Sequence, residues 1–489
     1  MFDKNSLENK TGPVMNRKTA LIFGFTLLFA SSIVSAASER PNIVFMMTDN
    51  FGWGELGIYG GGMIRGAETP RLDKFAQEGL RLLNFNVEVQ CTPTRSALMT
   101  GRHPIRSGTT KVIWGQLYGL VQWEITLAEV LSRADYSTGH FGKWHLGDSP
   151  GRYPTDQGFD EWYGIPNTSL ETLFPEQFQY DPAVGNTDYI MEGRKGETSR
   201  KIEPYDLRAR RKIDATVVEK TIDFMKRKVK KKEPFFAYVP FTQPHVPSLP
   251  HENFAGYTGN GEFADVLAEI DFRAGQILDS IDELGIRNNT IVIWTSDNGP
   301  DFVLPWPGSA GPWRGYVNTA TEGGIRTPFM IRWPGKVKAG RVSNEIVHIV
   351  DIFPTLATLV GEDVPGDRII DGVDQGEFFF AGTKKSARED FPIFFDEIEA
   401  YKWRNWKVHF SKPKDILESS ETRKYPWMYN VMLDPTEERD LFGEGRIEGF
   451  WILPHIGKRI NKFKKSLVQE PPIKVGTEDP YVPAKAGPE

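Results

Sequence analysis

Two uninterrupted apolar runs that end in the same polar pair constrain the fold of this chain most strongly. Residues 41–50 read PNIVFMMTDN, and residues 290–299 read TIVIWTSDNG. Runs of this kind, without polar alternation, predict strands covered on both faces, as in parallel sheets packed between helices. The Asp-Asn pairs then lie at the carboxyl ends of the strands, where open α/β sheets bind their ligands.

Segments with helical periodicity alternate with such strands through the first 380 residues. The clearest are residues 69–80, 126–136 and 214–232, and the last of them runs into an apolar strand at 234–241. This alternation predicts an α/β fold in which a large, mostly parallel sheet lies between two layers of helices. The basic run at 226–232 is best explained as a solvated helix end, because lysines in a last turn complement the helix dipole.

The pattern changes near residue 380. Short strand-like pieces are followed by a helix-like stretch at 460–469 and a proline-rich tail from Pro471. The strand-like pieces are residues 391–398, 402–410 and 429–435. We therefore expect a main domain over residues 37–380 and a smaller α+β domain, with a short antiparallel sheet, over residues 381–489.

The N-terminal segment has the pattern of an export signal. Basic residues after Met15 precede an apolar run from Ala20 to Ala30, and small residues end at Ala36. This order predicts a signal peptide over residues 1–36, with Met15 as an alternative initiator, and an exported protein that is periplasmic or secreted. The apolar run is shorter than a membrane span of roughly 20 residues, so we expect no span after signal removal.

The chain contains one cysteine, Cys91, among 489 residues. Exported proteins commonly form disulfides, and a single cysteine has no internal partner. Two interpretations are open at this point: a buried cysteine that packs as a small hydrophobic side chain, or a free reactive thiol. Buried structural cysteines are the commoner of the two.

The residues around Cys91 resemble the signature of the type I sulfatases, a family of the alkaline phosphatase superfamily. Residues 91–102 read CTPTRSALMTGR, which matches the family pattern C-x-P-x-R followed by T-G-R. Four more motifs follow in family order, which makes the resemblance specific. They are GHFGKWHLG at 139–147, PHVP at 244–247, WTSDNG at 294–299 and RTPFMIRWPG at 326–335. The resemblance implies an alkaline phosphatase-like fold and a sulfatase catalytic domain within residues 37–380.

In that family the cysteine is a precursor, because a maturation enzyme oxidises it to formylglycine. The positions that this enzyme reads in the family are present as Pro93 and Arg95. The resemblance therefore implies formylglycine at position 91 and a formylglycine-generating enzyme as a partner. A hydrated aldehyde carries two hydroxyl groups: one attacks sulfur, and loss of a proton from the other expels sulfate and restores the aldehyde.

The resemblance also implies a role for each remaining motif residue. The expected ligands of a divalent cation, calcium rather than magnesium, are Asp49, Asn50, Cys91, Asp297 and Asn298. Carboxylate and amide oxygens suit such ions. Arg95 is expected to hold the oxygen of residue 91, and Lys143 to bind a sulfate oxygen. His145 is the expected base for sulfate release, and His245 the expected acid toward the leaving oxygen.

Two positions depart from the family pattern. The family usually has a second aspartate where this chain has Asn50, and a lysine before the E-G-G motif where this chain has Val317. The first change removes a negative charge at the metal, and the second removes a positive charge at the sulfate. We hypothesise that they compensate, because a cation with one fewer anionic ligand attracts sulfate more strongly. Arg314 is an alternative source of the missing positive charge.

Three functions are open from the sequence. The first is release of inorganic sulfate from an aryl or carbohydrate sulfate ester. The second is hydrolysis of phosphate or phosphonate monoesters, since a metal and an activated nucleophile suit either anion. The third is non-catalytic binding of sulfated glycans, for which Cys91 would have no purpose. The net charge of −6 offers no basic excess, so we expect no nucleic-acid partner.

Overall fold

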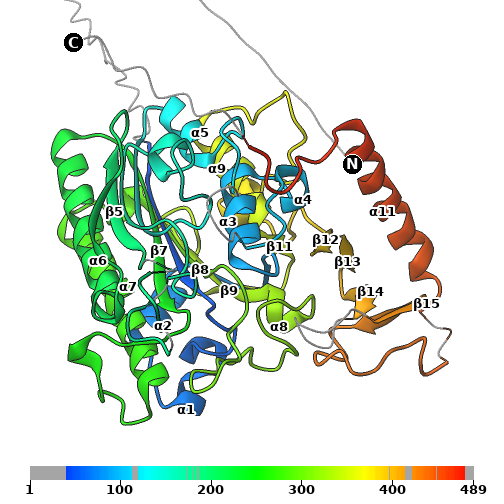
Figure 1. Ribbon diagram of the computed structural model, residues 1–489. Helices are drawn as coiled ribbons and strands as arrows, with labels where there is room; N and C mark the ends of the chain where they lie inside the picture. Colours follow the sequence, from blue (N-terminus) through cyan, green and yellow to red (C-terminus); the bar gives the residue numbers. More distant parts are fainter. Residues whose placement is uncertain are drawn as a thin grey trace, which may run out of the picture. The chain divides into compact units, whose positions relative to one another are not determined.

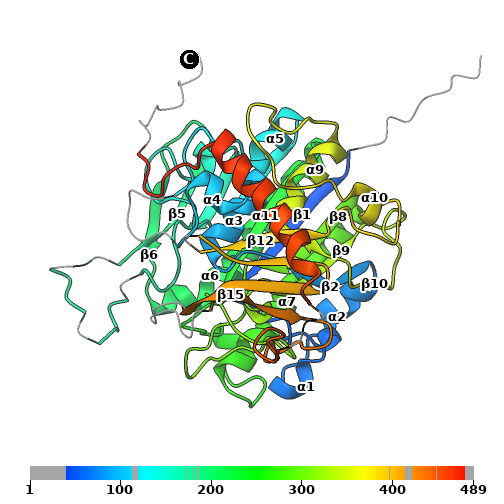
Figure 2. The same ribbon diagram turned by 90° about the vertical axis from the view of Figure 1, so that its right-hand side faces the viewer.

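We describe a computed structural model of the chain (Figures 1 and 2). The structure describes residues 40–478 except 113–118, 173, 179, 184, 186, 396, 413–420, 446 and 448. The predicted signal peptide, residues 1–36, lies outside the described residues. The described residues from Arg40 onward group into one compact unit, and the expected domain boundary after residue 380 stays a prediction. Within the described residues, none of the helices has both the length and the apolar character needed to cross a membrane.

A large mixed sheet forms the centre of this unit (Figure 1). Its strands are β1 Asn42–Asp49, β2 Leu80–Asn86, β3 Ser137–Lys143, β4 Glu161–Ile165, β5 Tyr189–Arg194, β6 Arg200–Pro204, β7 Phe235–Pro244, β8 Thr290–Ser296, β9 Arg326–Arg332, β10 Arg341–Ser343 and β11 Val347–His348. The order is β10-β2-β9-β8-β1-β7-β3-β4-β5-β6, and β11 also pairs with β2. The central run β8-β1-β7-β3-β4 is parallel, whereas β9, β5 and β6 are antiparallel to their neighbours. The predicted α/β fold with a large, mostly parallel sheet is confirmed.

The helices are α1 Gly62–Arg65, α2 Pro70–Gln77, α3 Cys91–Thr100, α4 Pro104–Ser107, α5 Leu127–Arg133, α6 Leu207–Lys231, α7 Glu262–Glu283, α8 Glu322–Ile325, α9 Ile352–Val360, α10 Gly376–Phe379 and α11 Ile452–Gln469. Short 3₁₀ turns lie at Gly57–Tyr59, Pro154–Asp156, Glu252–Phe254, Arg287–Asn289 and Ile349–Asp351.

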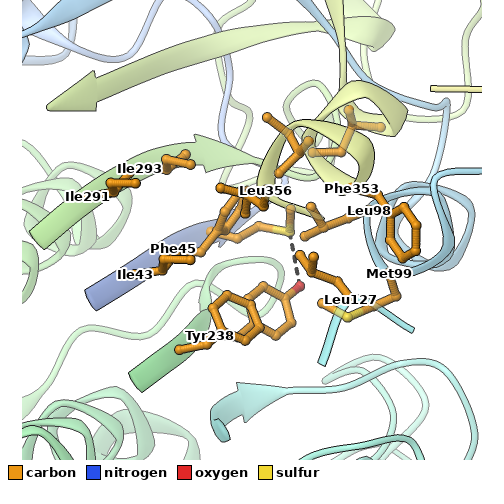
Figure 3. Packing of buried hydrophobic residues seen from close by; sticks show 14 of the residues in the cluster. Ile43, Phe45, Leu98, Met99, Leu127, Tyr238, Ile291, Ile293, Phe353 and Leu356 are labelled. Carbon is orange, nitrogen blue, oxygen red and sulfur yellow. Dashed lines mark hydrogen bonds between the residues drawn. The ribbon is translucent and has the colours of Figure 1, made fainter. Parts of the chain in front are cut away.

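Successive residues of a strand point to opposite faces, and β1 is apolar on both. Ile43, Phe45 and Met47 belong to a core with α3, α5 and α9 (Figure 3), whereas Val44 and Met46 belong to a core with α2, α6 and α7.

A separate antiparallel sheet follows in the C-terminal part of the chain. It consists of β12 Asp390–Phe394, β13 Ile398–Trp403, β14 Trp406–Lys412 and β15 Glu421–Asn430, in that order. One face packs on α11 around Trp403 and Val408. The other face contributes Ile393 and Ala400 to a core that also contains Val89, just before α3. The expected smaller α+β part with a short antiparallel sheet is confirmed.

α6 is longer than its sequence pattern predicts. It begins at Leu207 rather than near residue 214, because the Asp206 side chain caps it by accepting a hydrogen bond from the Ala209 N–H. Its other end fits the expectation of a solvated helix end. Lys226 and Lys230 are exposed there.

The second sheet contains one more strand than the sequence pattern indicates. Residues 402–410, expected to form a single strand, form the turn of a hairpin with β13 ending at Trp403 and β14 beginning at Trp406. The left-handed backbone of Arg404, with φ of 54°, permits this reversal. The piece at 429–435 was expected to be a strand, but β15 ends at Asn430 and turns follow it.

Candidate active site

The candidate active site lies where two strand ends meet the start of a helix. β1 and β8 are parallel neighbours that stay in register as far as Thr48 and Ser296, so the polar residues that follow lie side by side. Asp49 ends β1, and Asp297, directly after β8, donates its backbone N–H to the Thr48 carbonyl at 3.1 Å. Cys91 is the first residue of α3. The topology therefore brings three distant motifs to one edge of the sheet.

The Cys91 thiol is buried against the end of β1. Its sulfur lies 3.5 Å from Asp49 Oδ1 and 3.6 Å from Asn50 Oδ1. Burial raises the pKa of the thiol well above its ordinary value, so the thiolate is not the form present at neutral pH. These surroundings are polar, unlike those of a cysteine that packs as a hydrophobic side chain. In the chemistry implied by the resemblance, the sulfur stands in for an oxygen of formylglycine.

Arg95 and Lys143 tie the anionic groups together. Arg95 donates to Asp297 Oδ2 from Nε at 3.1 Å and from Nη2 at 2.8 Å, and to the Lys143 carbonyl at 2.8 Å. Lys143 Nζ donates to Asp49 Oδ2 and to Thr168 Oγ1, each at 2.8 Å. Burial alone would lower the pKa of Lys143, but Asp49 and the neighbouring anions raise it above the ordinary value. Both side chains are therefore held in their charged forms by the carboxylates beside them.

Asn50 is held by partners on both sides of its amide. Its Nδ2 donates to Asp301 Oδ2 at 2.9 Å, and its Oδ1 accepts from Asn298 Nδ2 at 2.5 Å. The backbone of Asn50 has φ of 61°, a conformation that asparagine adopts more readily than most residues. Because an amide nitrogen can only donate, the Asp301 carboxylate fixes the oxygen of Asn50 on the side of Cys91.

His145 pairs with a carboxyl group that the sequence analysis missed. Its Nε2 lies 3.2 Å from Glu171 Oε1, and its Nδ1 has no hydrogen-bond partner among the described residues. Burial, with the nearby charges of Lys143 and Arg95, lowers the pKa of His145 well below its ordinary value. Burial also raises the pKa of Glu171 to about 8, an effect that Lys143 opposes. With the proton on Nε2, His145 presents a lone pair at Nδ1 and can act as a base.

His245 is oriented by its own main chain. Its Nδ1 lies 2.8 Å from the Val246 carbonyl and donates to it, which leaves Nε2 as the atom that faces a reactant. Burial and Lys143 lower the pKa of His245 to about 4, whereas Asp301 raises it. Ligand atoms of Asp49, Cys91 and His245 all lie within 4.8 Å of one another. The structure thus brings His245 to the other predicted residues.

The oxygen donors at this edge fit a hard divalent cation. The four side chains that offer them are Asp49, Asn50, Asp297 and Asn298, all buried. Asn298 Oδ1 is buried without a hydrogen-bond partner among the described residues, an arrangement that a bound cation would satisfy. Carboxylate and amide oxygens are the ligands that calcium prefers. All predicted site residues are therefore brought together, while their roles stay predictions.

Val317 lies beside this site without contributing charge. Its side chain is buried, and its N–H donates to the Pro300 carbonyl at 3.0 Å, next to Asp301. Arg314, the alternative source of positive charge, donates from Nη1 to the Glu437 carbonyl at 3.1 Å in the C-terminal part. The compensation between Asn50 and Val317 stays a prediction, and Asp301 is a further charge that it must include.

Three residues of this neighbourhood escaped the sequence analysis: Thr168, Glu171 and Asp301. Asp301 follows the WTSDNG motif by two residues, so its proximity to the motif was a usable signal. Thr168 and Glu171 lie in a loop after β4 with no periodicity, and only the fold shows that they face Lys143 and His145.

Comparisons with known proteins agree with this geometry. The sequence model of the sulfatase family matches residues 41–362. N-acetylgalactosamine-6-sulfatase of Canis lupus familiaris is 36% identical over 392 residues, which cover 77% of this chain and 73% of the relative. Human arylsulfatase A is 34% identical over 450 residues, which cover 86% of each chain. The crystal structure of the PsFucS1 sulfatase from Pseudoalteromonas sp. superposes with a TM-score of 0.82 at 29% identity, over 89% of this chain and 92% of that one.

The family match covers more than half of the chain and includes every motif around Cys91. The relatives are aligned over more than two thirds of their own length. The chain therefore belongs to the sulfatase family and is an enzyme that hydrolyses sulfate esters.

Proposed function

We propose that this sulfatase works with formylglycine at position 91 and one calcium ion beside it, and that it is exported and acts on carbohydrate sulfate esters. The position of Cys91 carries the proposal, because its sulfur faces Asp49 and Asn50 within a buried set of oxygen donors. A maturation enzyme that reads Pro93 and Arg95 supplies the aldehyde. A hydrophobic packing role would not require these neighbours.

Four side chains would hold the cation: Asp49, Asn50, Asp297 and Asn298. When bound, the ion attracts a sulfate oxygen and lowers the pKa of the hydroxyl group of residue 91. Lys143 binds a second sulfate oxygen with its charged Nζ, which lies 2.8 Å from Asp49 Oδ2 before substrate arrives. Arg95 keeps Asp297 fixed through two hydrogen bonds.

The two histidines move protons in opposite directions. His245 gives a proton to the leaving oxygen from Nε2, because Nδ1 is held on the Val246 carbonyl. Its pKa of about 4, lowered by burial, keeps it neutral in the free enzyme, so binding of the anionic sulfate must raise that pKa before the acid step. His145 takes a proton at Nδ1, since its Nε2 faces Glu171.

Carbohydrate sulfates are favoured over simple aryl sulfates as the natural substrate class. Among the relatives, the N-acetylgalactosamine-6-sulfatase is named for a sulfated amino sugar. It is 36% identical to this chain over 392 residues. We therefore place a sugar 6-sulfate first in the panel of substrates to be screened.

The test compares the rates at which one enzyme hydrolyses sulfate, phosphate and phosphonate esters. The full chain is produced with a formylglycine-generating enzyme, and rates are measured on nitrophenyl sulfate, nitrophenyl phosphate and phenylphosphonate esters. We expect sulfate hydrolysis to dominate, to fall by several orders of magnitude in Cys91→Ala, and to require calcium after chelation. Faster phosphate or phosphonate hydrolysis would make the alternative esterase function the correct one.

Mass spectrometry of the peptide that contains residue 91 tests the modification separately. The active protein should carry an aldehyde there, and Pro93→Ala should reduce the modified fraction if the maturation enzyme reads that position. An active protein with an unmodified thiol would overturn the formylglycine proposal. An inactive protein with a thiol that still binds sulfated sugars would favour the non-catalytic binder.

A further inference from the structure

A broad groove lies beyond the C-terminal end of α3, the helix that begins at Cys91. It has a volume of about 1420 Å³ and is bounded by α11, the start of α4, residues 369–373 and the strands β12 and β13. α3 is ten residues long and therefore separates Cys91 from the groove by roughly 15 Å at 1.5 Å per residue. Figure 2 shows α11 in red across this part of the molecule. The groove is thus distinct from the candidate active site.

Positive charge dominates the lining of this groove, although the whole chain carries a net charge of −6. The cationic side chains are Arg106, Arg388, Lys458, Arg459, Lys462 and Lys465, against the two carboxylates Asp371 and Asp390. Both carboxylates are already paired, Asp371 with Arg106 at 2.7 Å and Asp390 with Arg459 at 2.6 Å, and Arg388 pairs with the buried Asp351 at 2.6 Å. The excess of positive charge therefore comes from the three lysines. The three lysines have no anionic partner among the described residues.

The three lysines form one stripe along α11. Lys458, Lys462 and Lys465 are spaced i, i+4 and i+7, so they lie on one face and span roughly 10 Å of the helix axis. Lys464, on the same helix, lies outside the groove lining. Three like charges that face one groove repel one another unless an anion binds there.

An exposed aromatic ring continues the same face. Trp451 lies seven residues before Lys458, two helical turns along the stripe. Its ring is held edge-on by Trp403 and Trp406, with centroid distances of 6.1 Å to each, yet 55% of the residue is exposed. A fixed, exposed indole is suited to stacking on a sugar ring.

We propose that this groove and the stripe of Trp451, Lys458, Lys462 and Lys465 bind a sulfated polysaccharide chain outside the catalytic site. The lysines bind sulfate groups along the chain, and Trp451 stacks on a sugar ring. The choice of a sulfated glycan over other polyanions rests on the proposed function, whereas the binding of a polyanion rests on the groove alone. Such a site would hold the polymer on the enzyme between successive cleavage events.

The test is a binding measurement on three forms of the full chain, each carrying Cys91→Ser to prevent turnover. One form carries no other substitution, and the other two are a groove variant and a matched control. The groove variant is Lys458→Gln/Lys462→Gln/Lys465→Gln. The matched control is Lys226→Gln/Lys230→Gln/Lys464→Gln, which removes the same charge at exposed positions outside the groove. Calorimetry with a heparin oligosaccharide should show about tenfold weaker binding for the groove variant, as loss of three exposed ion pairs implies. Its affinity should also depend less steeply on salt, because fewer counterions are released.

The outcomes separate this proposal from the catalytic one. The groove variant with Cys91 restored should hydrolyse nitrophenyl sulfate at the rate of the unsubstituted enzyme, because the stripe lies far from residue 91. Equal affinity of the groove variant and the control variant would overturn the site while leaving the sulfatase intact. Trp451→Ala should weaken binding of the oligosaccharide without changing the salt dependence. Tighter binding of single-stranded DNA than of the oligosaccharide, lost in the groove variant, would overturn the assigned ligand class.

Discussion

At the scale of single residues, Asn50 and Asp301 behave as a matched pair. The carboxylate accepts a hydrogen bond of 2.9 Å from Asn50 Nδ2, inside a buried site. Asn50→Asp would replace the donor by a second carboxylate at the same distance, so we expect the calcium-free protein to lose about 2–3 kcal/mol of unfolding free energy. Asn50→Asp/Asp301→Asn restores a donor opposite an acceptor and should recover most of that loss.

Denaturant unfolding in the presence of chelator measures all four corners of this cycle. The pair is coupled if the double variant loses less unfolding free energy than the two single variants lose together, by about 1 kcal/mol or more. Simple additivity would show that Asp301 does not orient Asn50. Calcium titration by calorimetry provides the second readout, since Asp301→Ala should weaken calcium binding by releasing the Asn50 amide.

Glu171 makes a prediction about pH. Burial raises its pKa from the ordinary value near 4.5 to about 8, so the folded protein holds this proton more tightly than the unfolded chain. Its contribution to stability is therefore fully present below pH 4.5 and is lost as the pH rises to about 8. Melting temperatures of the native protein and of Glu171→Gln should agree near pH 4.5, where Glu171 is neutral, and should separate toward pH 8, because only the native protein loses stability as Glu171 ionises. Parallel curves for the two proteins from pH 5 to pH 8 would contradict the raised pKa.

At the scale of elements, α3 depends on the glycine that ends it. Gly101 has φ of 68°, and its N–H donates to the Ala97 carbonyl as the C-cap. A Cβ atom at this position would lie 2.8 Å from Cδ1 of Phe353 on α9. The residue that carries it would also have to adopt the left-handed backbone conformation of Gly101. We expect Gly101→Ala to cost about 2–4 kcal/mol of unfolding free energy, through backbone strain and overpacking together.

Gly361 provides the matched control for that experiment. It caps α9 with φ of 83°, and a Cβ atom there would meet nothing within 4 Å. Gly361→Ala should therefore cost only the strain of the left-handed backbone, about 1–2 kcal/mol of unfolding free energy. The difference between the two variants isolates the contact with Phe353. If both cost the same, α3 can shift away from α9 without penalty.

Elements with one strong pattern were predictable from the sequence, and contacts across loops were not. β1 and β8 could be predicted because each is a continuous apolar run that ends in polar ligands. The start of α6 was missed because a single capping residue, Asp206, outweighs the weakly apolar turn that follows it. Glu171 was missed because nothing local marks it, and its contact with His145 exists only after β3 and β4 pair.

At the scale of the whole molecule, a buried ionic cluster joins the two sheets. Lys402 on β13 donates from Nζ to Glu322 Oε2 at 2.7 Å, and to the side-chain oxygens of Asn84 and Asn86 on β2 at 2.9 and 3.0 Å. Burial alone would raise the pKa of Glu322, but Lys402 and Lys407 hold it well below its usual range. The E-G-G motif thus anchors the small sheet to the large one.

Lys402→Met tests whether this cluster couples the two sheets. The substitution keeps the length of the side chain but removes one of three cations around Glu322, which retains Arg326 at 3.1 Å and Lys407 at 3.2 Å. It also takes the hydrogen-bond donor from Asn86 Oδ1, so we expect a loss of about 2–3 kcal/mol of unfolding free energy. The control is Lys424→Met on the exposed part of β15, which should change stability by less than about 0.5 kcal/mol. Limited proteolysis should cleave the Lys402→Met protein first within β12–β15, while the large sheet stays protected. An unchanged cleavage pattern would show that apolar packing alone couples the two sheets.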